Sequence, residues 1–100
     1  MTLKISVSQV AAKWYKDEFS IEGKEHIQFF ARYGGIGGLV PGFSLGLQLN
    51  TPEDIYASTN VLDITFFVEQ KDAWYFSGKH LKIQLNHTLN EPEFIYIDAD

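Results

Sequence analysis

Residues 26–49, HIQFFARYGGIGGLVPGFSLGLQL, contain two segments of alternating residue type joined by a glycine-rich run. In residues 43–49, Phe or Leu occupies every second position, with small or polar residues between them. Residues 26–33 alternate less strictly, with apolar side chains from Ile27 onward on one face. This period of two predicts two β-strands, each with one face directed at a core. The glycines between them predict a loop that uses positive φ angles.

The same alternation recurs along the chain and predicts further short strands at residues 3–5, 62–69, 81–85 and 94–97. A helix is expected to begin at Ser6, which forms a capping-box pattern with Gln9, and to end before Gly23. Its apolar residues recur at helical spacing, which predicts one buried face. Residues 71–76 do not alternate and predict a helical turn closed by Gly78.

These elements predict one α+β or mainly β domain over residues 1–100, with one N-terminal amphipathic helix. A chain of 100 residues can bury one core, and 45% hydrophobic residues supply the material for it. We find no internal repeat and no linker, so a second domain is not expected.

The charge and cysteine counts argue against several classes of function. A formal net charge of −5, with only 8 scattered Lys and Arg, argues against binding to nucleic acid or to an anionic membrane. There are no cysteines, so disulfides, thiolate catalysis and cysteine-ligated metals are excluded. Neither a signal-peptide pattern nor a membrane-spanning apolar run is present, and a cytoplasmic location is expected.

No catalytic or cofactor motif is legible in the sequence. The three histidines are His26, His80 and His87, and no two have the four-residue spacing of a helical zinc motif. The glycine run fits neither a dinucleotide fingerprint nor a P-loop, because a strand follows it instead of a helix. We therefore expect no enzyme activity, no cofactor and no bound metal.

Two interpretations of the glycine run stay open. It is either a structural turn between two strands or a loop that contacts a partner or ligand, made of Tyr33, Gly34, Gly35, Ile36, Gly37 and Gly38. The aromatic cluster at residues 74–76 poses a similar choice. Core packing is the favoured interpretation of that cluster, and an exposed contact patch is the alternative.

The order of these segments also resembles a known family. A helix, then FFARYGGIGG at residues 29–38, FSLGL at 43–47 and DAWYF at 72–76 are similar to the HesB/IscA-like superfamily of A-type iron–sulfur carriers. The likeness is greatest to its short, cysteine-free Gram-positive branch. The resemblance covers nearly the whole chain and implies a compact β-sandwich-type domain with a packed helix.

The A-type carriers hold iron or a cluster with three cysteines, and none of these carries over. Ile36 occupies the position most like the first cysteine, and residues 97–100 stand where a Cys-Gly-Cys motif is expected. The resemblance therefore implies a non-catalytic interaction protein on this scaffold. It also implies iron–sulfur assembly proteins as partners and residues 33–38 as the contact loop.

Other hypotheses remain beside this one. The chain could bind a small ligand or divalent metal through its histidines and the carboxylates near its C-terminus. A cryptic enzyme is the third and least favoured hypothesis. Homo-oligomerisation is a further hypothesis, because A-type relatives self-associate and alternating strands leave an exposed sheet edge.

Overall fold

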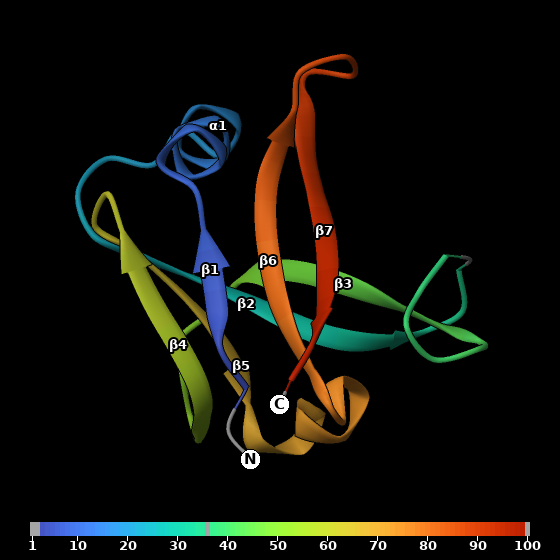
Figure 1. Cartoon of the computed structure of the whole chain (residues 1–100). Coiled ribbons are helices and arrows are strands. Elements are labelled where there is room, and N and C mark those ends of the chain that lie inside the picture. The colour runs from blue at the N-terminus through green and yellow to red at the C-terminus, as the bar shows by residue number, and fades with distance from the viewer. Residues whose placement is uncertain (1–2, 36, 100) are drawn as a thin grey trace.

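The computed structural model describes residues 3–35 and 37–99, which form two β-sheets, one α-helix and one 3-10 helix (Figure 1). The elements follow in this order: β1 (Ile5–Val7), α1 (Gln9–Glu18), β2 (Glu25–Tyr33), β3 (Phe43–Leu49), β4 (Ile55–Val61), β5 (Ile64–Glu69), the 3-10 helix η1 (Gln70–Phe76), β6 (Lys79–Asn86) and β7 (Glu91–Asp98). The expected mainly β class is confirmed. A HesB-like arrangement is not.

One sheet has four strands in the order β3-β2-β5-β4, and the other has three in the order β1-β6-β7. The pairs β2–β5 and β1–β6 are parallel, and the other neighbours are antiparallel. The β6–β7 pair passes across the β2–β3 pair, with α1 at one end of the molecule and η1 at the other (Figure 1). This crossing places η1 beside the half of β2 that ends at Tyr33.

The core lies between the two sheets and under α1. Phe29 and Phe66 stack with their ring centroids 6.0 Å apart, and both are fully buried. Tyr15 of α1 contacts the same cluster, with its ring centroid 5.8 Å from that of Phe66. Each buried aromatic ring contributes about 2 kcal/mol by removing apolar surface from water. The core therefore anchors β2 and β5, on which the candidate site depends.

The helix begins later than expected. Ser8, and not Ser6, is its N-cap, and the Ser8 hydroxyl accepts a hydrogen bond from the Ala11 amide at 3.1 Å. Ser6 instead lies in β1, where it pairs with Lys82 of β6. The parallel pairing with β6 extends the first strand to Val7, and this tertiary contact overrides the capping pattern at Ser6.

The sequence analysis missed β4 altogether. The β4–β5 turn places Leu62 and Asp63 at φ 53° and 66°, in the left-handed region where glycine is usual. Because neither turn residue is glycine, the turn signal in the sequence is weak, and the alternation over residues 62–69 predicts a strand that starts at Leu62, inside the turn. The strands β6 and β7 also extend beyond the expected ranges, because they pair with each other from Lys79–Asp98 to Asn86–Glu91.

Candidate functional site

Three aromatic side chains form a surface row at the end of the β2–β3 hairpin that carries the glycine-rich loop, with Tyr33 and Trp74 exposed and Phe43 half-buried between them. Tyr33 ends β2, Phe43 begins β3, and the two are directly paired with ring centroids 5.5 Å apart. Trp74 of η1 continues the row, its ring 5.2 Å from that of Phe43. Tyr33 is 85% exposed and Trp74 is 50% exposed. We call Tyr33, Phe43 and Trp74 the aromatic row.

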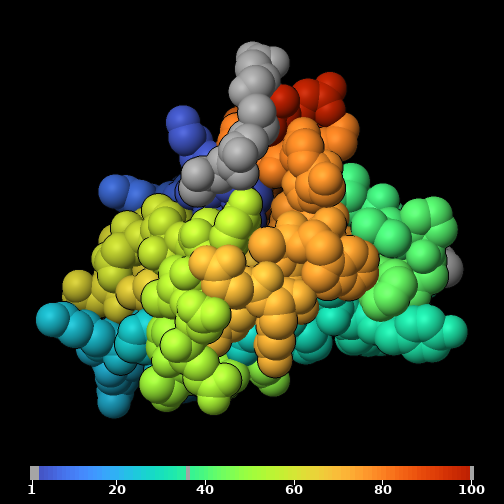
Figure 2. Space-filling view, turned by 90° about the horizontal axis from the view of Figure 1, so that it is seen from below, coloured from blue at the N-terminus to red at the C-terminus, as the bar shows by residue number. Residues whose placement is uncertain are grey.

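The space-filling view shows how this surface is assembled. The orange surface of η1 lies between the yellow-green segment around β4 and the green lobe at the distal end of the β2–β3 hairpin (Figure 2). Residues far apart in the sequence thus share one face of the molecule. Large exposed aromatic rings carry much of the binding energy in protein interfaces, because they bury a large area at low entropy cost.

The glycine-rich loop at residues 34–42 is a closed structure that begins beside the aromatic row. The Gly34 amide donates to the Gly42 carbonyl at 2.7 Å, and the Phe43 amide donates to the Val40 carbonyl at 3.0 Å. Gly34, Gly35 and Gly37 have φ angles of 101°, 79° and 81°. Residues other than glycine rarely adopt such angles, so the loop conformation favours glycine at these three positions.

Gly38 is required for a different reason, which is space. A Cβ atom at this position would lie 2.0 Å from the Phe43 carbonyl oxygen and 2.8 Å from the Tyr75 hydroxyl. That hydroxyl accepts a hydrogen bond from the Leu39 amide at 2.8 Å, and Tyr75 is itself buried in η1. The close approach at Gly38 thus lets η1 hold the loop in place.

Asp72 attaches η1 to β2 from the other side. The partners of β2 in β5 end at the pair Phe29–Val68, so the next β2 amides on that edge have no strand beside them. Asp72 Oδ1 accepts a hydrogen bond from the Ala31 amide at 3.3 Å and so replaces the missing strand. Asp72 is only 7% exposed, and no described residue donates to its Oδ2 atom. This side chain therefore positions the helical turn that carries Trp74.

Burial raises the pKa of the Asp72 carboxyl above its ordinary value. The neighbouring Glu69 carboxylate acts in the same direction, whereas the hydrogen bond from Ala31 and the charge of Lys71 oppose the shift. The folded state therefore holds this proton more tightly than the unfolded chain does. The stabilisation that this gives is complete below the ordinary carboxyl pKa and is lost as pH rises through the raised value.

We expect Asp72→Asn to melt at a higher temperature than the parent at neutral pH, because the amide keeps the acceptor for Ala31 and removes the buried charge. This advantage should shrink as pH falls below the ordinary carboxyl range, where Asp72 is protonated. Thermal melts followed by circular dichroism across this pH range test the expectation. Asp63→Asn, at an exposed turn, is the matched control. A difference for Asp72→Asn that does not change with pH would contradict this account.

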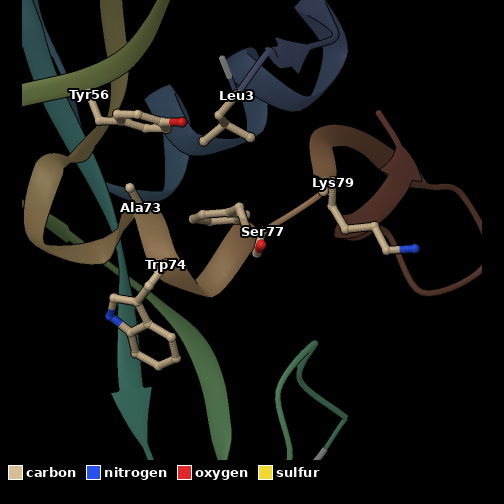
Figure 3. A pocket seen from close by; sticks show the side chains of 8 residues that line it. Leu3, Tyr56, Ala73, Trp74, Ser77 and Lys79 are labelled. Carbon is tan, nitrogen blue, oxygen red and sulfur yellow. The ribbon is translucent and has the colours of Figure 1, made fainter. Parts of the chain in front are cut away.

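Two hollows lie near this surface, and Trp74 lines the first of them. One has a volume of about 350 Å³ and is lined by residues of η1 with Leu3, Tyr56 and Lys79 (Figure 3). In Figure 3 the Trp74 indole extends from η1 away from Leu3 and Tyr56. The second hollow, about 270 Å³, lies between the glycine loop, β3 and β7. Both have the size to receive one large side chain of a partner.

The structure brings most of the residues expected at the contact loop together. Tyr33, Gly35 and Gly37 are exposed and Gly34 and Gly38 are half-buried, whereas Ile36 is outside the described residues. Sequence reasoning missed Phe43 as a member of this surface. It also favoured a core position for Trp74, and this is wrong, because only Tyr75 and Phe76 of that cluster are buried. The 3-10 helix η1 has about three residues per turn, so Trp74 faces solvent while Tyr75 and Phe76 face the core.

The histidines do not form a metal site. His80 Nδ1 accepts a hydrogen bond from the Lys4 amide at 2.9 Å, and the His26 ring packs edge-on against Phe67. Among residues 3–35 and 37–99, no group of three or more His, Cys, Asp or Glu side chains is arranged to hold a metal ion. The hypothesis of a divalent metal site built from histidines and carboxylates is therefore wrong for this part of the chain.

Comparison with known proteins decides the kinship. The chain is 34% identical over 94 residues to a pyruvate dehydrogenase inhibitor of Bacillus subtilis, and the match covers 94% of this chain and 99% of that protein. The chain belongs to the family of this inhibitor. Family members also occur in staphylococci. An uncharacterised Staphylococcus saprophyticus protein is 35% identical over 89% of this chain and 94% of its own length, and one from Staphylococcus aureus is 30% identical over 83% and 88%.

Membership of this inhibitor family overturns the resemblance to the A-type iron–sulfur carriers. No protein-family model matches the chain, and no solved structure matches it. The predicted role as a partner of iron–sulfur assembly proteins is also wrong, because the named relative is a pyruvate dehydrogenase inhibitor. The glycine run is one of the segments on which the resemblance rests, and in this fold the positive φ angles of Gly34, Gly35 and Gly37 account for glycine at these positions.

None of the helices within residues 3–35 and 37–99 is long and apolar enough to cross a bilayer.

Proposed function

We propose that this chain is a protein inhibitor of pyruvate dehydrogenase that acts by binding the enzyme. The observation that carries the proposal is its 34% identity to the Bacillus subtilis inhibitor over 94% of this chain and 99% of the relative. The match leaves almost no part of the relative uncovered, so this chain contains the counterpart of nearly every segment of that protein. A role in binding, without catalysis, agrees with the name of the relative.

The contact surface in this proposal is the aromatic row together with the glycine loop at residues 34–38. Tyr33 and Trp74 expose large rings beside a loop that hydrogen bonds hold in one shape. A surface fixed before binding loses little conformational entropy on association, and this favours affinity. The hollow beside Trp74 gives a partner side chain a place to insert.

Two exposed cations are close in sequence to this surface. Arg32 immediately precedes Tyr33, and Lys71 lies one turn before Trp74. Because side chains alternate along a strand, Arg32 is directed to the opposite face of β2 from Tyr33, whereas Lys71 lies on the same short helix as Trp74. A partner surface with apolar pockets and some acidic residues at their rim would complement this arrangement.

The test is a steady-state assay of the pyruvate dehydrogenase complex of the host, with the purified chain added in increasing amounts. We expect activity to fall in a saturable way, with half-inhibition at the dissociation constant measured separately by biolayer interferometry. Heat-unfolded protein is the control. If activity stays at its starting value at concentrations that saturate the sensor, the chain binds without inhibiting. If neither signal changes, the proposed function is wrong.

A further inference from the structure

The two sheets have four edge strands, and three of these edges are protected from pairing with another chain. β1 has only three residues, and β4 has an irregular register between Ile55 and Ala57 and adjoins β1 (Figure 1). β7 carries four residues that disfavour added strands: Glu91, Pro92, Glu93 and Asp98. Short length, bulges, proline and charge are the usual means by which proteins prevent edge-to-edge association.

The fourth edge, β3, has none of these protections. Its seven residues, FSLGLQL, contain no charged residue and no proline, and they pair with β2 without a register shift from Phe43 to Leu49. Gly46 lies under the ring of Phe30, where a Cβ atom would come within 2.6 Å of that ring. The strand therefore pairs regularly and carries no charge along its whole length.

The hydrogen-bond pattern shows which backbone groups of β3 are available. At the two ends of the β2–β3 ladder, the Asn50 amide donates to His26 and the Gly34 amide donates to Gly42. Hydrogen-bonded pairs alternate along an antiparallel ladder, so Ser44, Gly46 and Gln48 point their backbone groups at β2.

The backbone amides and carbonyls of Leu45, Leu47 and Leu49 consequently point away from the sheet. Among the described residues, no strand pairs with this side of β3. Unpaired groups of this kind are satisfied in water, but they also form a template for another extended segment.

We propose that β3 pairs with β3 of a second copy of this chain, antiparallel about a two-fold axis. A register centred on Gly46 places Leu45 opposite Leu47 of the second copy and Phe43 opposite Leu49. In this register the outward-pointing backbone amides and carbonyls of one copy face those of the other, as a hydrogen-bonded ladder requires.

A second copy is the occupant that the chemistry of this strand favours. In an antiparallel self-pairing, charges near the centre of the strand lie close to their own copies, and like charges near each other destabilise a sheet. β3 contains no charge, so this penalty is absent despite the net charge of −5 for the whole chain. Pairing joins the two four-stranded sheets into one continuous sheet and removes both free edges.

The test uses the purified full chain, with its mass measured by light scattering and its amide exchange measured by NMR over a range of concentrations. We expect a dimer whose formation slows exchange of the Leu45 and Leu47 amides. Leu49→Lys should raise the dimer dissociation constant about tenfold, because each dimer loses two Leu–Phe cross-strand pairs. Leu89→Lys, at an exposed leucine of the β6–β7 hairpin, should leave it unchanged.

Two results would overturn the proposal. The first is a chain that stays monomeric at every concentration, with rapid exchange of the Leu45 and Leu47 amides. The second is a dimer in which these amides still exchange rapidly and Leu49→Lys has no effect, since another surface would then join the copies. Neither result depends on inhibition of pyruvate dehydrogenase.

Discussion

Tyr33→Ala is expected to weaken inhibition of pyruvate dehydrogenase by roughly thirtyfold, because truncation of an interface hot spot costs about 2 kcal/mol. Tyr33 is 85% exposed, so in the free chain its ring gains little from packing, and its partner there is Phe43 at 5.5 Å. The free energy of unfolding should therefore fall by less than about 1 kcal/mol. The measurement pairs an inhibition curve with a thermal melt of each variant.

Leu89→Ala is the matched control for this variant. Leu89 is 65% exposed and lies in the β6–β7 hairpin, outside the aromatic row and the glycine loop. It should inhibit as the parent does, because removing an exposed side chain outside the interface leaves binding unchanged. If Tyr33→Ala inhibits as well as the parent, the aromatic row is not the contact surface, even where the chain itself is an inhibitor.

Gly38→Ala is expected to lower the free energy of unfolding by about 3 kcal/mol, at the upper end of the cost of overpacking. The added Cβ atom would lie 2.0 Å from the Phe43 carbonyl oxygen and 2.8 Å from the hydroxyl of the buried Tyr75, so it cannot be accommodated without moving the backbone. To relieve the clash, the loop must move away from Tyr75 and break the hydrogen bond from the Leu39 amide. Urea denaturation followed by fluorescence measures the loss.

The loop movement in Gly38→Ala should also reach the proposed contact surface. We expect its inhibition to weaken along with its stability, since the loop adjoins Tyr33. Gly37→Asn is the control, because the Cβ position there is open and asparagine tolerates a positive φ angle. The Gly37→Asn substitution should lower the free energy of unfolding by less than about 1 kcal/mol. Equal stability of the two variants would show that the close approach at Gly38 does not hold the loop.

Several parts of the fold follow from local sequence alone. The alternation in residues 43–49 predicts β3 with its observed bounds, and residues 26–33 predict all but the first residue of β2. The non-alternating segment at residues 71–76 predicts η1 to within one residue of its start. Periodicity encodes these elements because one face of each is buried, and burial imposes its repeat on the residue types.

Other parts depend on residues that are distant in sequence. Ser6 has the pattern of a helix cap, yet pairing with β6 places it in a strand. The β4–β5 hairpin turns at Leu62 and Asp63 without a glycine. The pairing of its two strands stabilises positive φ angles that these residues do not favour by themselves. Family kinship could not be deduced from the glycine run either, since many unrelated loops need glycine for the same backbone reason.

By itself, the sequence determined the class of the fold, the lack of any thiol chemistry and the need for glycine after Tyr33. These properties depend on composition or on neighbouring residues. Only the tertiary structure decided that Tyr33, Phe43 and Trp74 form one exposed row, and that Asp72 attaches η1 to β2. The physical reason is that a side chain is buried or exposed according to what packs against it, and these contacts join residues that are 10, 31 and 41 positions apart.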